Sequence, residues 1–181
     1  MFNIGDYVVY KRDVCKIKAV KEKYVKEKDY FVLSPIDDDS LIIHIPKDNL
    51  SLLRPLIDRE EVDRIISLIP EISIIESNDK MIENEYKNLL HSDNHIDLIR
   101  IIKTTYLRNK AKIDNNKKVG EKDNYYFEKP EKYLYNEFSV VLNKTVEETK
   151  QYIIQHLNNI KWLFFFIYNG KIYRRNGGQL C

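Results

Sequence analysis

The stretch that decides the fold spans residues 3–17, "NIGDYVVYKRDVCKI". Gly5 and Asp6 make a turn pair, because glycine tolerates a positive φ and aspartate hydrogen-bonds its own backbone. The β-branched and aromatic residues 7–10 then favour a strand. Apolar residues alternate with lysines over residues 15–19, as in a half-buried strand. The pattern predicts two adjacent strands in this stretch.

Further strand signals continue to about residue 55. Residues 30–33 and 41–45 are rich in apolar and aromatic residues, and the turn "SPIDDDS" at residues 34–40 separates them. The leucines of residues 50–53 suggest a fifth strand, whereas the charged residues 21–28 indicate a connection. Several short strands with turns at this spacing predict a small barrel or rolled sheet.

The pattern changes to helical periodicity after residue 57. Helix starts are expected at Asp58, at Asn78 or Asp79, at Asp93 or Asn94, near Glu121 and at Asn143 or Thr145. The segment 121–142 contains Pro130 as its weak point. We therefore predict an α+β chain with a β-rich domain at 1–56, an all-helical bundle at 57–160 and a tail at 161–181. In the tail, Asn169-Gly170 between apolar runs favours a β-hairpin, with a continued helix or non-native terminal residues as the alternatives.

The composition limits the classes of protein to which this chain can belong. The chain has 181 residues, of which 43% are apolar and 32% charged, as in ordinary globular proteins. The net charge of +2 does not by itself indicate a nucleic-acid partner. Cys15 and Cys181 cannot form a metal site alone, and Cys15 fits a small core residue. We see no secretion signal, and the longest apolar run is too short to cross a membrane, so we expect a cytoplasmic protein.

Catalytic signatures are missing from the sequence. The four histidines are scattered, at positions 44, 91, 95 and 156. His91 and His95 have a spacing that suits a metal, but a third ligand is not evident. The sequence holds neither a phosphate-binding loop nor a nucleophile elbow. We expect neither an enzyme nor a bound cofactor or metal.

Three groups of residues carry a resemblance to a known family. They are the pattern "F-x-[IV]-G-D-x-V-V-Y" at residues 2–10, the corner formed by Ile45, Pro46 and Asn49, and "LRPLI" at residues 53–57. Together they resemble the CarD/CdnL family of bacterial transcription regulators. The β part is also similar to the RNA polymerase-interacting module of the transcription-repair coupling factor. The likeness extends over roughly residues 1–158 and is weaker in the helical half.

This resemblance implies a Tudor-like β module of the small SH3-like barrel type. In the family, this module docks on the β subunit of RNA polymerase, and the helical domain lies against promoter DNA and stabilises the open complex. The positions that the likeness assigns to polymerase binding are Lys23 and His44. We add Ile45 and Pro46, which follow His44 in the sequence. No small-molecule substrate and no membrane partner are implied.

The sequence departs from the family at three places. Many members have Pro-x-x-Gly after the tyrosine, where this chain has Lys11 to Val14, so the turn must be built without glycine. His44 is a mostly neutral group where members often carry a permanent cation. Many members also insert a tryptophan at the DNA minor groove, and the corresponding place here is Asp79 or Lys80, neither of which is aromatic.

Cations near the third expected helix are the candidates for DNA contact. The residues that we assign to DNA binding are Arg100, Lys103, Arg108 and Lys110. A solvated helix face is the alternative interpretation of these cations. The missing tryptophan favours a second hypothesis, in which the protein binds polymerase or another protein without contacting DNA. A third hypothesis is a free-standing nucleic-acid binder.

Overall fold

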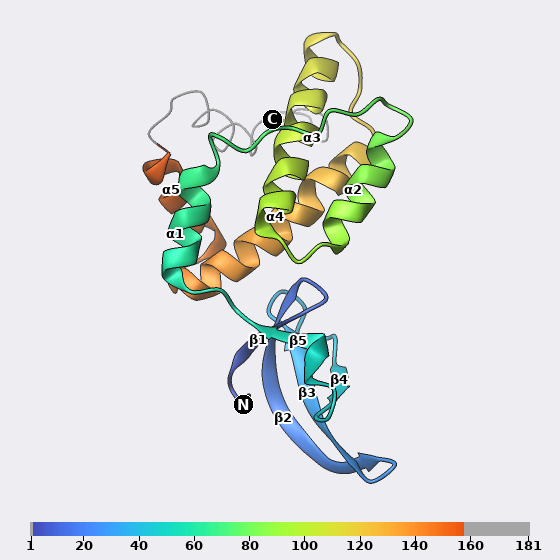
Figure 1. Ribbon diagram of the computed structural model, residues 1–181, viewed down its shortest axis with the longest axis vertical. Helices are drawn as coiled ribbons and strands as arrows, with labels where there is room; N and C mark the ends of the chain where they lie inside the picture. Colours follow the sequence, from blue (N-terminus) through green and yellow to red (C-terminus); the bar gives the residue numbers. More distant parts are fainter. Residues whose placement is uncertain (1, 158–181) are drawn as a thin grey trace, which may run out of the picture.

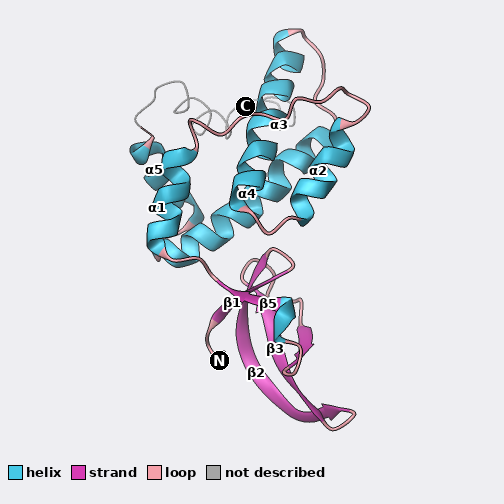
Figure 2. Cartoon of the chain, in the orientation of Figure 1, coloured by secondary structure: helices cyan, strands magenta, loops and turns pink. Residues whose placement is uncertain are grey.

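The computed structural model describes residues 2–157 and has an α+β fold, as predicted. The sheet occupies one end of the molecule and the helices occupy the other (Figures 1 and 2). The tail residues 161–181, with their predicted hairpin, lie outside the described residues.

In the described part of the chain, five antiparallel strands form the sheet. They are β1 Tyr7–Tyr10, β2 Asp13–Val25, β3 Lys28–Pro35, β4 Ile43–Pro46 and β5 Leu53–Pro55, in the order β4-β3-β2-β1-β5. The sheet is open rather than closed into the expected barrel, because β4 and β5 lie at its opposite edges. A short 3-10 helix, Leu50–Leu52, takes up most of the segment where the fifth strand was expected, so that strand begins at its end.

The segment 21–28 is part of a strand hairpin, and the prediction of a connection there was wrong. Strand β2 continues to Val25, which pairs with Lys28 across a two-residue turn. The turn residues Lys26 and Glu27 have φ of 50° and 57°. Both residues are therefore left-handed, as a tight turn that matches the strand twist requires. The hairpin extends away from the helices (Figure 1).

The turn between β1 and β2 is also built without glycine. Lys11 and Arg12 occupy its two central positions with φ of 48° and 77°. A non-glycine residue in this region costs about 1–2 kcal/mol. The side chain of Arg12 offsets part of that cost, because its Nη2 donates hydrogen bonds to Ser92 Oγ at 3.2 Å and to Asn94 O at 3.3 Å.

One face of the sheet carries its own hydrophobic core. The buried members are Val8, Cys15, Ile17, Phe31, Leu33, Ile45 and Leu53. Cys15 is fully buried with a free thiol, which confirms its interpretation as a small core residue.

Within residues 2–157, five helices follow the sheet. They are α1 Arg59–Leu68, α2 Ile82–His91, α3 His95–Asp114, α4 Glu121–Leu142 and α5 Val146–His156. The predicted caps Asp58, Asn94 and Thr145 accept backbone hydrogen bonds at the starts of α1, α3 and α5. The expected cap Asn78 accepts hydrogen bonds one turn before α2, and the N-cap residue of this helix is Met81. Pro130 lies inside α4 without ending it, and it is buried there.

The helices share a second core that is separate from the core of the sheet. Its buried residues come from four helices and include Ile65 of α1, Ile99 of α3, Phe138 of α4 and Ile153 of α5. A smaller cluster joins α2 to α3 and α4 through Ile82, Tyr86, Ile101 and Tyr126, with Ile75 from the connector. Because the two modules have separate cores, polar contacts carry much of the connection between them.

The strongest of these polar contacts is a buried ion pair between β5 and α4. Arg54 donates from both terminal nitrogens to Glu137, at 2.6 and 2.8 Å, and from Nε to Asp93 at 2.9 Å. Glu137, whose side chain is 3% exposed, also accepts from Ile57 N at 3.1 Å and from His95 Nε2 at 2.9 Å. Each carboxylate oxygen therefore has two donors, which is what a buried charge needs.

A second contact joins the loop between β3 and β4 to the same helix. Asp37 accepts hydrogen bonds from Lys132 Nζ at 2.6 Å and from Asn136 Nδ2 at 3.1 Å. Because both contacts involve α4, this helix is the structural link between the two modules.

The ionisation of Glu137 should make stability depend on acid. Burial raises the pKa of Glu137, but the hydrogen bonds from Arg54 and His95 outweigh burial and hold the pKa at about 2. A carboxyl with a depressed folded-state pKa stabilises the fold above its unfolded pKa, and this contribution is lost as pH falls. We expect the free energy of unfolding to decrease as pH falls from about 4.5 to about 2, as measured by chemical denaturation.

The variant Glu137→Gln should lose this part of the acid dependence. At neutral pH its free energy of unfolding should be about 3 kcal/mol lower than that of the wild type, because Arg54 stays between β5 and α4 without the carboxylate of Glu137. The matched control is Glu61→Gln on α1, where the exposed pair with Arg64 should contribute little. Equal acid profiles for wild type and Glu137→Gln would contradict the assignment.

Candidate functional site

Strand β4 provides a free edge of the sheet. It pairs with β3 on one side, and within residues 2–157 no strand pairs with its other side. The opposite edge strand, β5, has three residues and leads towards α1, and its Arg54 is bound to the helices. An unpaired strand edge can accept a strand from a partner through backbone hydrogen bonds. The edge of β4 is therefore the better docking candidate.

The register of β3 and β4 shows which backbone groups point outward. Lys47 N donates to Asp29 O at 2.9 Å, so this opposed pair is hydrogen-bonded. Hydrogen-bonded pairs alternate along an antiparallel ladder, so Ile45 and Ile43 also direct their amide and carbonyl groups at β3. It follows that the N–H and C=O of His44 and the C=O of Pro46 point away from the sheet.

Aromatic contacts bring the β2–β3 hairpin beside this edge. The ring of Tyr24 stacks on the ring of His44 with centroids 4.9 Å apart and an interplanar angle of 17°. Tyr24 also meets the edge of Tyr30 at 5.7 Å, and Lys21 Nζ lies 4.3 Å from the Tyr24 ring centroid. The structure thus places Lys23, the neighbour of Tyr24, on the same end of the sheet as His44.

The surface around β4 is rich in exposed apolar residues. Leu41 and Ile42, which precede the strand, are 48% and 58% exposed, and Tyr24 and Val25 of the hairpin are 48% and 42% exposed. An apolar patch next to an open strand edge is typical of a protein-docking surface. The hairpin adds exposed lysines together with the exposed Glu22 and Glu27, so the surface combines apolar contact with charges of both signs.

Comparison with known families identifies the domain that contains the sheet. Residues 2–57 match the family described as the CarD-like/TRCF RID domain, which includes all five strands and ends at the junction with α1. Residues 2–57 form a CarD/TRCF-type RNA polymerase-interacting domain. Domains of this family are non-catalytic interaction modules. No curated protein matches the chain.

The residues that we assigned to polymerase binding gather on one side of the RID domain. Lys23 is exposed and lies 3.7 Å from Glu27, an exposed pairing that leaves its ammonium accessible. His44 and Pro46 are half-buried on β4, whereas Ile45 is 3% exposed and belongs to the core. Of this set, Lys23 and Pro46 are available to a partner through their side chains, His44 has a buried Nε2 and a ring stacked on Tyr24, and Ile45 supports the strand from within. Their role in binding stays a prediction.

The four cations that we assigned to DNA do not share one surface. Lys110 is exposed, and Arg100 is half-buried with Asp97 at 3.7 Å. Arg108 forms an ion pair with Asp79. Asp79 is one of the two positions that match the missing tryptophan, so a salt bridge occupies this place here. Arg100, Arg108 and Lys110 stay candidates for DNA contact.

Lys103 lies inside the helical bundle instead of on its surface. It is 2% exposed, and its Nζ donates to the carbonyls of Ile69, at 3.0 Å, and Ile72. Burial lowers the pKa of Lys103 to about 8. These bonds hold the chain that follows α1 against α3, so the structure gives Lys103 a packing role and does not present it to DNA.

Two features of the site were not recognised from the sequence. Tyr24 lies in a segment that we took for a connection, because Tyr24 and Val25 are its only strand-favouring residues among charged ones. Arg12, Arg54 and Glu137 join the RID domain to the helices across 80 or more residues of chain. No local pattern marks such pairs.

Within the described part of the chain, every helix is too short or too polar to cross a membrane.

The different positions of Lys103 and Lys110 predict different effects on stability. Lys103→Ala should lower the free energy of unfolding by about 2 kcal/mol, because two buried carbonyls lose a donor. Lys110→Ala, an exposed change on the same helix, should have almost no effect. Urea denaturation of both variants measures the difference, and equal stabilities would contradict the buried position of Lys103.

Proposed function

We propose that this protein is a CarD-like transcription regulator that binds the β subunit of RNA polymerase. The free edge of β4 in the RID domain is the observation that carries the proposal. In this proposal the RID domain spans residues 1–56, the helical domain spans residues 57–160, and the helical domain contacts promoter DNA. With this partner, the proposal also includes a bacterial origin and a cytoplasmic location.

The expected mode of docking is strand addition. The outward N–H and C=O of His44 can pair with a strand of the polymerase, whereas the C=O of Pro46 already accepts a hydrogen bond from Asn49 N at 3.0 Å. Leu41, Ile42 and Tyr24 would then cover apolar surface on the partner, and Lys23 would lie at the rim. Charge at a rim acts mainly on the rate of association, so Lys23 should contribute less to the affinity than the strand edge does.

The effect on transcription would follow from differential binding. A protein that binds the open promoter complex more tightly than the closed complex shifts the equilibrium towards the open complex by that difference in free energy. The exposed Lys110 and the half-buried Arg100 are the cations that support contact with phosphates. Tyr125, which is 52% exposed on α4, is an aromatic side chain that can reach bases.

Replacing one edge amide tests strand addition. His44→Pro removes an N–H that points away from β3, so the pairing of β3 and β4 should survive. Binding to a purified β-subunit fragment, measured by biolayer interferometry, should weaken about tenfold or more. His44→Ala, the matched control, keeps the N–H and should change the affinity much less.

The two variants also distinguish the mode of docking from the proposal itself. Equal losses in both variants would indicate that the partner uses the histidine side chain. Wild-type affinity in both variants, with the fold intact by circular dichroism, would contradict docking at β4. Failure of the wild-type protein to bind the fragment at micromolar concentration would contradict the proposed partner.

A salt titration tests the contact with DNA. With polymerase bound to a fork-junction promoter, each phosphate contact contributes about 0.9 to the slope of log affinity against log salt concentration. Arg100→Ala combined with Lys110→Ala should reduce that slope by about 1–2. The control is Arg64→Ala on α1, an exposed arginine outside the assigned set. A slope that is unchanged in the double variant would favour the second candidate function, an interaction module that binds polymerase without touching DNA.

A further inference from the structure

The loop before β4 combines exposed apolar residues with negative charge. Leu41 and Ile42 are both exposed. Three consecutive aspartates, residues 37–39, precede them, and the side chain of Asp39 is 85% exposed. The loop leads directly into Ile43, so it lies at the first end of the free β4 edge.

The tip of the β2–β3 hairpin combines exposed apolar residues with positive charge. Tyr24 and Val25 are exposed, and residues 21–28 contain four lysines against two glutamates. Strands β3 and β4 are antiparallel, with Tyr30 opposite Pro46, so the hairpin tip lies beyond the last residue of β4. The tip points away from the helices (Figure 1). It therefore lies at the second end of the same edge.

A two-fold axis near His44 would bring these unlike ends together. Two copies of one edge strand can pair antiparallel, and the same surface of each copy then forms the interface. The outward N–H and C=O of His44 would exchange two hydrogen bonds with the same groups of the second copy. Antiparallel pairing places the start of one β4 beside the end of the other. The loop of each copy thus faces the hairpin tip of its partner, with apolar residues against apolar residues and aspartates against lysines.

The charges at the two ends are only weakly engaged within one copy. Asp39 lies 3.5 Å from Lys18, and Lys23 lies 3.7 Å from Glu27. All four side chains are about half exposed or more, at 49–85%. Exposed ion pairs of this kind contribute little, so Asp39 and Lys23 remain available to a second copy.

We propose that a second copy of this chain pairs antiparallel with β4 and covers the edge that polymerase would use. Because β4 has only four residues, the interface is small, as in transient complexes. Self-association therefore depends on protein concentration, and a bound polymerase displaces the second copy by mass action. This displacement rests on the proposed function, whereas the self-association does not.

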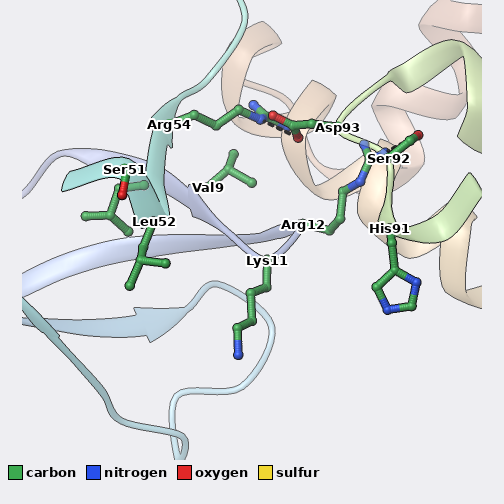
Figure 3. A pocket seen from close by; sticks show the side chains of 10 residues that line it. Val9, Lys11, Arg12, Ser51, Leu52, Arg54, His91, Ser92 and Asp93 are labelled. Carbon is green, nitrogen blue, oxygen red and sulfur yellow. Dashed lines mark hydrogen bonds and ion pairs between the residues drawn. The ribbon is translucent and has the colours of Figure 1, made fainter. Parts of the chain in front are cut away.

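The connection between the RID domain and the helices lies outside this interface. Arg54 pairs with Asp93 beside β5, and Arg12 contacts Ser92 in the same region (Figure 3). Strands β5 and β4 form opposite edges of the sheet. A second copy at β4 therefore leaves these contacts unchanged.

Sedimentation equilibrium of the full chain at micromolar to millimolar concentration measures the self-association. The wild-type protein should dimerise reversibly. Asp39→Lys and Lys23→Glu each place like charges opposite one another twice in the dimer, so each should weaken dimerisation about tenfold or more. An equimolar mixture of the two variants restores both attractive pairs and should form mixed dimers with the affinity of the wild type. The control Arg64→Glu reverses an exposed charge on α1 and should dimerise as the wild type does.

The outcomes distinguish this proposal from the proposed function. A wild-type protein that stays monomeric would overturn the pairing at β4, as would a dimer that neither variant weakens while circular dichroism shows both variants folded. The β-subunit fragment should dissociate the dimer, and a dimer that binds the fragment without dissociating would also overturn the pairing. A dimer that shows the charge-swap pattern but does not bind the fragment would contradict the proposed function and support the self-association.

Discussion

The pairing of Arg54 with Glu137 is the interaction on which the arrangement of the molecule depends. It joins the last strand of the RID domain to the C-terminal half of α4, across 83 residues of sequence. Replacing a buried ion pair with apolar groups often costs no stability, so its value lies in geometry more than in net free energy. Four donors on one carboxylate fix the direction of Arg54, and with it the direction in which β5 leaves the sheet. The separate cores of the two modules could not fix this angle alone.

The ion pair between Arg54 and Glu137 lies at one edge of the sheet and leaves the opposite edge free. The order β4-β3-β2-β1-β5 puts the strand that holds the helices at one edge and the open strand at the other. The long β2–β3 hairpin extends from the same side as β4 and away from the helices (Figure 1). A partner can therefore occupy β4 without displacing Arg54 or Glu137. The fold thus separates an attachment surface from the helices that it carries, which suits the proposed role of a regulator delivered to polymerase.

The sequence predicts local features well, but it predicts the burial and the distant partners of charged residues poorly. Asp58, Asn94 and Thr145 could be identified as helix caps because capping depends on a few neighbouring residues. The hairpin at residues 21–28 was missed because a solvent-exposed strand pair and a charged loop have the same composition. Lys103 was assigned to the surface because lysine is rarely buried, but α3 packs between other helices and the connector after α1. The partnership of Arg54 and Glu137 is invisible in the sequence, since each alone resembles an ordinary surface charge.

The two arginines at the joint differ in one respect that matters for function. Arg54 has two carboxylates as acceptors, whereas Arg12 has one hydroxyl and one carbonyl, and its buried Nε and Nη1 have no partner among residues 2–157. A partner bound at β4 can bring the helices to DNA only if the RID domain and the helices keep a fixed relative orientation. If this orientation were flexible, ordering it on binding would lower the affinity. Arg54 and Asp37 both bond to α4. Arg12 adds a separate contact to the α2–α3 loop, through Ser92 Oγ and Asn94 O. Because these contacts lie on different elements, together they restrict rotation of the helices relative to the sheet.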